Sequence, residues 1–213
     1  MYPSRGTSLD QTSTATGIVL AGGRSTRFGS DKLMATYRGE PLLHHPILRL
    51  AEVCAGVVVV IAPGAPIPSL PSGVPVRIAR DVAEADGPLA GLLAGLERVD
   101  SDLALAVGGD MPELAASVLR RMLGLAATEG SAEAVALSDR DRVRPLPIVV
   151  RAAPARRAAR DLLDGGDRRL GSILGALRTT VIDENVWVEL DPRGGTLLDI
   201  DVPGDLATPP DPA

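Results

Sequence analysis

A glycine pair followed by three cations makes the stretch Gly17–Lys32 the most chemically suggestive part of the chain. Its first part, Ile18-Val19-Leu20-Ala21, is short, apolar and β-branched, which is typical of a buried strand. The strand ends at Gly22-Gly23, and glycine lets a backbone approach an anion closely enough for free N–H groups to point at it. The cations that follow within nine positions are Arg24, Arg27 and Lys32. Because they can neutralise phosphate charge, the pattern favours a phosphate-binding loop.

The spacing of the glycines excludes two familiar phosphate motifs. No Gly-Lys-Ser/Thr follows at the Walker A spacing, and glycines at 22, 23 and 29 do not fit Gly-x-Gly-x-x-Gly. A tight turn after the strand, with solvated surface cations, is the simpler alternative. The concentration of basic residues shifts the interpretation toward an anion site.

Asp110 is the sharpest single candidate for chemistry. It follows a predicted buried strand at about 103–107 and two glycines, and it precedes Pro112 by two positions. A strand would deliver this carboxylate to a ligand site on a stiff support. The alternative is a helix N-cap, because Asp is favoured there and a helix is predicted from about 114.

Asp199 and Asp201 form a second acidic feature. Side chains alternate along a strand, so a short strand predicted over 197–201 would place both on one face. Two such carboxylates repel each other unless a cation lies between them or solvent screens them. Magnesium prefers oxygen ligands, usually one or two carboxylates together with substrate phosphates. We therefore expect Asp110 and one of this pair to hold the Mg²⁺ of a nucleoside triphosphate, with an exposed strand end as the alternative.

The remaining polar clusters allow weaker interpretations. Arg168-Arg169 follows Gly165-Gly166 and forms either a second anion site or a charged helix start. His44 and His45 are adjacent, whereas metal-binding histidines on a helix need i, i+4 spacing, so a packing or surface role is favoured. No Ser-His-Asp constellation can be argued.

Alternating strands and helices must position these residues. We expect strands at about 17–21, 57–62, 76–79, 103–107, 133–137, 146–150, 179–182 and 197–201, and helices at about 42–53, from 87, and at 114–127, 154–164 and 168–177. The order in the first half predicts a Rossmann-like three-layer α/β/α fold with a mostly parallel mixed sheet. In such sheets ligands collect at the carboxyl ends of the strands, where Gly22, Asp81 and Asp110 lie. One domain is expected over 16–206, between a disordered tail at 1–15 and a Pro-rich tail at 207–213.

The composition limits the classes of partner. The 213 residues have a formal net charge of −5 and only 2% aromatic residues, which argues against nucleic-acid and anionic-membrane binding. One cysteine, Cys54, excludes an intramolecular disulfide and suggests a small buried residue. No apolar run approaches the roughly 20 residues of a membrane span, and the N-terminus lacks a signal-peptide core. A soluble cytoplasmic protein, monomeric or weakly oligomeric, is expected.

Six segments in order along residues 16–206 carry a resemblance to a known family. They are Leu20–Lys32, Asp81 with Asp86–Leu92, Gly109–Pro112, Arg144–Pro147, Gly166–Leu170 and Asp199–Leu206. The first resembles the signature Leu-Ala-Gly-Gly-x-x-x-Arg-Met/Phe-Gly-x-x-Lys of nucleotidyltransferases with the nucleotide-diphospho-sugar transferase fold. Together the six segments are most similar to those of the molybdenum cofactor guanylyltransferases.

The resemblance implies transfer of GMP from GTP to a molybdopterin-type phosphate, with release of pyrophosphate and with Mg²⁺ as cofactor. By the same resemblance Lys32 and Arg27 bind the phosphates and Asp110 binds the metal, which makes these three the catalytic candidates. With Asp201 and Asp199, which the spacing argument above adds, Asp110 forms the set of metal candidates. The implied nucleotide-binding residues are Leu20, Ala21, Gly22, Gly23, Arg24, Lys32, Asp81, Gly87 and Asp110. The implied acceptor-binding residues are Arg144, Arg168 and Arg169.

Three departures from the family pattern leave alternatives open. Asp199 and Asp201 stand where the guanylyltransferases have paired Asn, and related cytidylyltransferases also use Asp there. Gly109 replaces Cys, and Arg144 replaces His or Gln near the expected acceptor. The alternatives are cytidylyl transfer to molybdopterin, nucleotidyl transfer to another small phosphate, and a non-catalytic nucleotide sensor.

Overall fold

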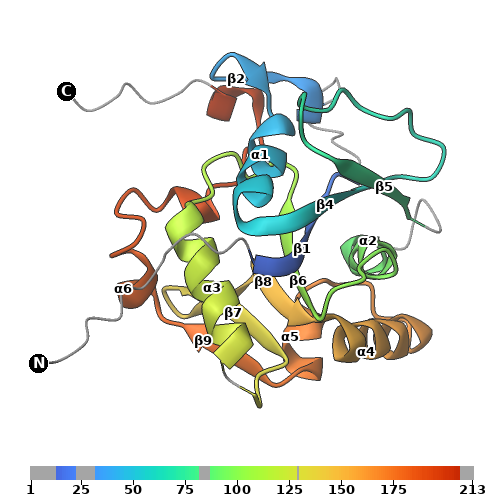
Figure 1. The fold of residues 1–213 in the computed structure, drawn as a ribbon, viewed down its shortest axis with the longest axis vertical. Helices are drawn as coiled ribbons and strands as arrows, with labels where there is room; N and C mark the ends of the chain where they lie inside the picture. The colour runs from blue at the N-terminus through green and yellow to red at the C-terminus, as the bar shows by residue number, and fades with distance from the viewer. Residues whose placement is uncertain (1–12, 23–31, 82–86, 129, 207–213) are drawn as a thin grey trace, which may run out of the picture.

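One seven-stranded sheet organises the chain in a computed structural model that describes residues 13–22, 32–81, 87–128 and 130–206 (Figure 1). The strand order is β5-β4-β1-β6-β8-β7-β9. The strands are β1 (Ser13–Leu20), β4 (Cys54–Ile61), β5 (Val76–Arg80), β6 (Leu103–Gly108), β7 (Ala134–Asp139), β8 (Arg142–Arg151) and β9 (Thr179–Ile182). A separate two-stranded hairpin pairs β2 (Thr36–Tyr37) with β3 (Glu40–Pro41).

The sheet is mixed, and β8 is its one reversed strand. β1 pairs in parallel with β4 and β6, and β4 pairs in parallel with β5. β8 lies antiparallel to both β6 and β7, while β7 and β9 are parallel. The interior strands are apolar runs without polar alternation, as strands covered on both faces should be. The predicted mostly parallel mixed sheet is confirmed.

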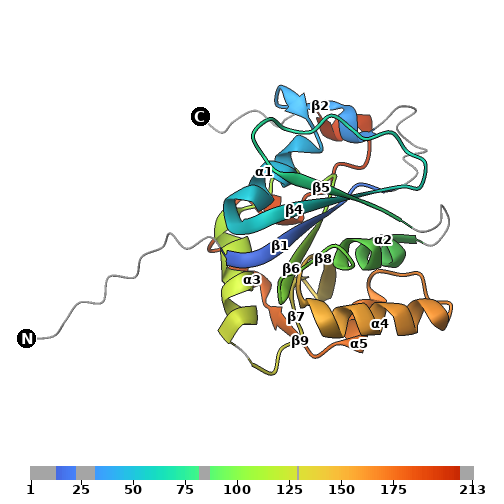
Figure 2. The same cartoon turned by 45° about the vertical axis from the view of Figure 1, so that its right-hand side comes forward.

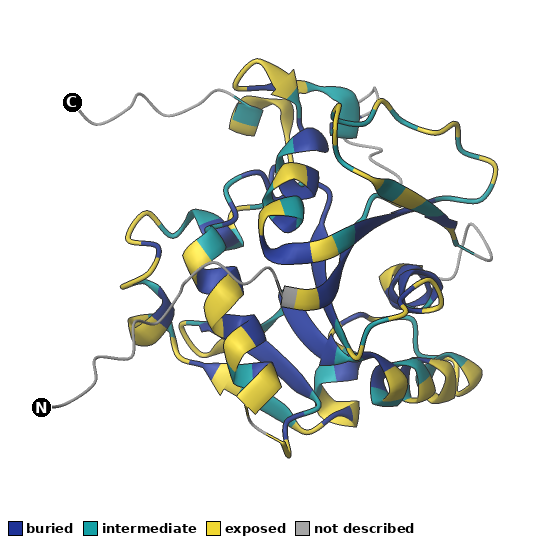
Figure 3. Cartoon of the chain, in the orientation of Figure 1, coloured by how far each residue is buried: buried dark blue, intermediate teal, exposed yellow. Residues whose placement is uncertain are grey.

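Helices cover both faces of the sheet (Figure 2). On one face lie α1 (His44–Val53), α3 (Ala116–Thr128) and α6 (Glu184–Trp187), which share a core with β1, β4, β6 and β7. On the other lie α2 (Gly87–Leu96), α4 (Ala152–Asp164) and α5 (Ser172–Ala176). The central strands β1, β4 and β6 are mostly buried, whereas the outer helix surfaces are exposed (Figure 3). No helix among the described residues is long and apolar enough to cross a membrane.

The strand order creates a crevice where ligands bind in folds of this kind. The chain runs outward from β1 to β4 and β5 on one side, and returns through β6 on the other side of β1. This reversal is a topological switch point, and the loops after β1 and β6 flank it. Gly109 N–H donates to the carbonyl of Leu20 at 3.0 Å, so the ends of β1 and β6 stay joined just beyond the β6 strand.

Several predicted elements differ from the structure. β1 begins at Ser13, inside the expected tail, because Ser13 pairs with Cys54. The strand predicted over 197–201 is wrong: Gly195–Leu197 is a 3₁₀ turn, and the Ile200 N–H donates to the carbonyl of Asp110 instead of to a neighbouring strand. The helix predicted from 168 starts only at Ser172, because the Asp167 carboxylate accepts the Arg169 N–H in a turn.

The packing roles predicted for the cysteine and for the two histidines are confirmed. Cys54 is buried, and burial raises the pKa of its thiol to about 12. His44 and His45 bond to the backbone carbonyls of Ser69 and Tyr37.

Gly95→Ala tests the close approach of α2 to the sheet. A Cβ at Gly95 would lie 2.6 Å from Ile18 Cγ2 and 3.1 Å from Val60 Cγ2. We expect the free energy of unfolding to fall by about 1–3 kcal/mol, because overpacking outweighs the higher helix propensity of alanine. The control is Gly124→Ala in α3, where nothing lies within 4 Å of the Cβ position and a gain of about 0.5–1 kcal/mol is expected. Urea unfolding measures both, and equal shifts would contradict the packing argument.

Candidate active site

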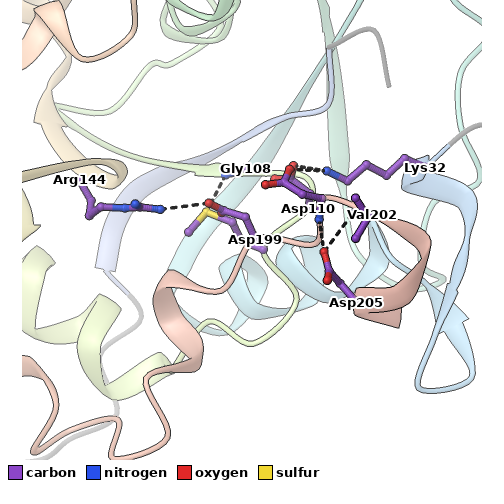
Figure 4. Close-up of polar contacts among 9 residues, drawn as sticks. Lys32, Gly108, Asp110, Arg144, Asp199, Val202 and Asp205 are labelled. Atoms are coloured by element: carbon purple, nitrogen blue, oxygen red, sulfur yellow. Dashed lines mark hydrogen bonds and ion pairs between the residues drawn. The ribbon is translucent and has the colours of Figure 1, made fainter. Parts of the chain in front are cut away.

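A buried lysine bound to two aspartates forms the centre of the site (Figure 4). Lys32 begins a 3₁₀ turn, Lys32–Met34, and is only 7% exposed. Its Nζ lies 2.8 Å from Oδ2 of Asp110 and 3.4 Å from Oδ1 of Asp201. The sequence suggested separate basic and acidic groups, whereas the structure brings them into direct contact.

Two glycines place Asp110 against this lysine. A Cβ at Gly108 would lie 2.5 Å from Oδ1 of Asp110, and one at Gly109 would lie 3.2 Å from the carbonyl oxygen of Leu20. Glycine fits this turn without displacing either neighbour, because a side chain at 108 would push against the Asp110 carboxylate and one at 109 would crowd the end of β1. The N-cap alternative for Asp110 is wrong, since α3 begins six residues later, at Ala116. The carboxylate is therefore available to a ligand or to Lys32.

The segment after the 3₁₀ turn Gly195–Leu197 brings the second and third carboxylates. Asp199 and Asp201 flank Ile200, which is fully buried. Although this segment is not a strand, both aspartates line a cavity of about 200 Å³ together with Asp110 and Arg144. Asp205 fixes its end, because its carboxylate accepts the N–H groups of Asp201 and Val202 at 2.8 and 2.9 Å. These backbone hydrogen bonds lower the pKa of Asp205.

Arg144 enters the same cavity from the other side (Figure 4). The β7–β8 pairing slips after Ala136, which faces Ile148, so that Leu137 faces Arg144. The intervening residues, with their two prolines, leave the ladder as a bulge that directs Arg144 toward the site. Arg144 Nη2 lies 3.1 Å from Oδ2 of Asp199, and its Nη1 lies 3.9 Å from Asp139. Its buried Nε has no hydrogen-bond partner among the described residues.

Carboxylates outnumber cations in this cavity. Burial is the main cause that raises the pKa of Asp199 to about 6, and the charge of Asp110 raises it further. Arg144 opposes this shift, and Asp201 adds to it. The three aspartates therefore repel one another in spite of Lys32 and Arg144, and the site favours an added cation.

The predicted nucleotide side lies along the ends of β1 and β5. Leu20 ends β1, and Ala21 continues it by donating its N–H to the carbonyl of Val60. A Cβ added at Gly91 would lie 3.8 Å from Oδ2 of Asp81 and 3.9 Å from Cδ2 of Leu20. Asp81 and Leu20 thus both face the first turns of α2. Gly22 is exposed directly after them.

Gly87 begins α2 in a conformation that suits glycine. Its φ is +72°, and a Cβ there would lie 2.9 Å from the carbonyl oxygen of Arg168. Arg168 therefore lies beside the start of α2, and its Nη1 donates to the carbonyl of Leu163. Arg169 pairs with Asp167 and holds the pKa of that carboxyl well below its usual range. Neither arginine lines the cavity that contains Asp110. Gly23, Arg24 and Arg27 lie outside the described residues.

A family model described as a MobA-like NTP transferase domain matches residues 17–180. The chain belongs to this family. A relative from Chloroflexus aggregans, named probable molybdenum cofactor guanylyltransferase, is 30% identical over 196 residues, which cover 89% of this chain and 90% of the relative. A relative of the same name from Natronomonas pharaonis is 30% identical over 177 residues, which cover 82% and 86%. The predicted enzyme class, nucleotidyltransferase, is confirmed by this membership.

Solved structures of the same fold extend beyond the close relatives. The molybdopterin-guanine dinucleotide biosynthesis protein A from Archaeoglobus fulgidus aligns with a TM-score of 0.71 and 18% identity, covering 90% of this chain and 94% of that one. The 2-C-methyl-D-erythritol 4-phosphate cytidylyltransferase from Thermus thermophilus aligns with a TM-score of 0.62 and 18% identity, covering 90% and 95%. These likenesses confirm the predicted nucleotide-diphospho-sugar transferase fold.

Within this MobA-like site, reasoning from sequence missed the groups that hold the carboxylates in place. Asp205 lies in a segment that resembles the family, but its position after Pro203 was given no role. A proline at the first helical position with an acidic residue two positions later is a helix-start signal, and it offered a clue. The Glu113 side chain, three residues after Asp110, offered none, because its partner Tyr37 is distant in sequence.

Asp199→Asn tests the repulsion among the carboxylates. A folded-state pKa near 6, above the unfolded value, means that the folded protein binds more protons, so this group destabilises the fold as pH rises through the range. Without metal, the variant should exceed the native chain in unfolding free energy at about pH 8 by about 1 kcal/mol, after allowance for solvent screening. The difference should vanish near pH 3.5, because the Asp199 carboxyl of the unsubstituted protein is then largely protonated in the folded and in the unfolded state.

The measurement is thermal unfolding in the presence of a chelator at both pH values. Asp102→Asn is the control, because Asp102 lies exposed before β6, at the opposite end of that strand. It should give the same difference at both pH values. A gain for Asp199→Asn that does not depend on pH would contradict the assignment.

Proposed function

We propose that the chain transfers GMP from GTP to the phosphate of molybdopterin or its molybdenum form, with release of pyrophosphate. The names of the curated relatives support this base and this acceptor. The observation that carries the proposal is the contact of Lys32 with Asp110 and Asp201 at the switch point of an NTP transferase domain. A lysine and carboxylates gathered at that crevice suit a triphosphate and its counter-cation.

The reaction needs positioning and charge compensation more than proton transfer. An oxygen of the acceptor phosphate attacks the α-phosphorus of GTP and forms the new P–O bond. The bond from the α-phosphorus to the oxygen bridging to the β-phosphorus breaks, and pyrophosphate leaves with those electrons. The acceptor phosphate is already an anionic nucleophile, so no general base is required. Lys32 is placed to offset phosphate charge, and the loops hold the two reactants in line.

The carboxylates of the cavity fit a magnesium ion. No group of three or more His, Cys, Asp or Glu side chains arranged to hold a metal occurs among the described residues. Magnesium is commonly bound by one or two carboxylates and completed by substrate phosphates, which is what Asp110 and Asp201 offer. Burial raises the pKa of Asp199 most, and the nearby charge of Asp110 raises it further, so a cation bound beside these carboxylates would relieve part of their repulsion. When bound, the ion would supply charge stabilisation for the triphosphate.

Pyrophosphate release with each of the four nucleoside triphosphates, with and without molybdopterin, tests this function. We expect release that depends on molybdopterin and Mg²⁺ and that prefers GTP. A preference for CTP would replace the guanylyl assignment with a cytidylyl one. Nucleotide binding with no release under any condition would favour a sensor.

Lys32→Ala serves as the site variant for that assay. It removes a charge-assisted contact to the phosphates, so triphosphate binding should weaken by about 1.5–3 kcal/mol. Arg49→Ala, at an exposed ion pair with Glu52 on α1, is the control and should leave binding unchanged. Unaltered GTP affinity in Lys32→Ala would contradict the phosphate role.

Arg144 is the acceptor-binding candidate that the structure supports best. It lines the cavity beside Asp110, whereas Arg169 is paired with Asp167 and Arg168 lies at the start of α2. Its guanidinium, held by Asp199 at 3.1 Å, is a planar donor suited to a phosphate. We propose that it binds the acceptor phosphate across from the GTP side.

Arg144→Gln should raise KM for the acceptor about 10- to 100-fold, because a charge-assisted hydrogen bond is lost. KM for GTP should stay unchanged, since the proposed contact is with the other substrate. Steady-state kinetics with each substrate varied in turn separates the two. The matched control is Arg142→Gln, two residues earlier on β8 and exposed. A rise in KM for GTP with none for the acceptor would reverse the assignment.

A further inference from the structure

We propose that Tyr37 and Glu113 form a positioning pair that sets the geometry of Lys32, Asp110 and Asp201. Among the described residues, neither Tyr37 nor Glu113 forms a hydrogen bond or ion pair with Lys32, Asp110 or Asp201, so the role of the pair is indirect. The effect on catalysis rests on the proposed transfer reaction, whereas the effect on metal-ion binding rests only on the proposed magnesium site.

The pair is a buried phenol bonded to a carboxylate. Tyr37 is 2% exposed, and its hydroxyl donates to Oε1 of Glu113 at 2.7 Å. The Arg38 guanidinium lies 3.2 Å from the same oxygen. Burial and the neighbouring Glu113 charge raise the pKa of Tyr37, so the phenol stays a donor throughout the neutral range. A leucine or phenylalanine would fill the same space without a buried polar group that must find a partner.

The ring of Tyr37 supports the segment that carries Asp201. Tyr37, Leu42 and Ile200 form a small separate core, and Leu206 packs against it. Ile200 lies between Asp199 and Asp201, and its N–H donates to the carbonyl of Asp110 at 3.0 Å. Figures 1 and 2 both show the β2–β3 hairpin beside the 3₁₀ turn Pro203–Leu206. The ring of Tyr37 therefore packs beneath the Asp201 segment directly, and it supports the Asp110 loop through the bond from Ile200.

Glu113 connects the Asp110 loop to the same neighbours. It lies three residues after Asp110, on the loop before α3. A Cβ at Gly195 would lie 2.8 Å from Cβ of Glu113, so the segment leading to Asp199 packs directly on it. Thr196 then accepts the N–H of Ala115. Glu113 is thus fixed on one side by the Asp199 segment and on the other by the Tyr37 hydroxyl.

The three functional segments converge on this small core, beneath the charged contacts of Lys32. Lys32 leads into the hairpin within five residues, Asp110 leads to Glu113, and Asp201 follows Ile200. If the phenol bond is lost, the more exposed Arg38–Glu113 ion pair remains, but the hairpin and the Asp110 loop lose the buried bond that fixes their relative position. Small displacements of this kind weaken chelation and in-line attack strongly, because both need fixed distances.

Tyr37→Phe removes the bond and keeps the ring. We expect Mn²⁺, used in place of Mg²⁺, to bind about 5- to 10-fold more weakly in electron paramagnetic resonance titrations, with and without a GTP analogue whose α–β bridge is methylene. The kcat/KM for GTP should fall about 10-fold. Glu113→Gln, which keeps an oxygen acceptor, should retain most Mn²⁺ affinity, whereas Glu113→Leu should lose it. The double variant Tyr37→Phe/Glu113→Leu should be no worse than the worse single change.

Trp187→Phe is the matched structural control. Its buried indole N–H donates to the carbonyl of Ser138 at 2.7 Å, on α6 and away from the cavity. It should lower Tm at least as much as Tyr37→Phe but leave Mn²⁺ binding and kcat/KM unchanged. If both variants lose stability and neither changes Mn²⁺ affinity, Tyr37 is structural only and the proposal is wrong. If the native chain releases no pyrophosphate from GTP, the proposed function fails, and the Mn²⁺ comparison still decides the role of Tyr37.

Discussion

The ammonium group of Lys32 and the carboxylates of Asp110 and Asp201 depend on one another. A cation buried to this degree is stable only if it is paired, and loss of both carboxylates would leave an uncompensated buried charge. Asp110 and Asp201 lie 78 and 169 positions after Lys32 in the sequence. The charge balance among the three residues is therefore also a tertiary constraint. The glycine turn at 108–109, the Ile200 N–H bond to Asp110 and the Asp205 carboxylate all hold backbone in the one arrangement that satisfies it.

The same balance suits a site that must accept a highly charged ligand. Under the proposed function, a triphosphate brings negative charge near Lys32, and its metal ion brings positive charge near Asp110 and Asp201. Each partner of the resting ion pair thus gains a substrate partner of the opposite sign. Arg144 and Asp199 form a second such pair in the cavity, at 3.1 Å, on the side that we propose for the acceptor. The resting pairs keep charged groups satisfied and in place, which lowers the reorganisation required on binding.

Local patterns predicted much of the fold, because buried strands and amphipathic helices can be recognised from the periodicity of apolar residues within short stretches of sequence. β4 and β6 were recognisable as apolar runs, and the position of Asp110 followed from the alternation of strands and helices. The strand over 197–201 failed for a physical reason: alternation shows which side chains share a face, but not whether a neighbouring strand edge is available. The Lys32–Asp110 contact and the Tyr37–Glu113 bond join distant segments, and no local pattern encodes such pairings.

The reversed strand β8 explains how the cavity acquires its second cation. In a purely parallel sheet, only residues after the carboxyl ends of strands reach the ligand edge. Because β8 runs antiparallel to β6, with Ala106 opposite Ile148, its beginning lies at that same edge. The prolines at 145 and 147 lie where the β7–β8 register shifts, so the backbone bulges just after Arg144, which pairs with Leu137 of β7 while its guanidinium reaches Asp199. The proline pair, which already indicated a bend in the sequence, therefore lies directly beside Arg144, whose side chain enters the site.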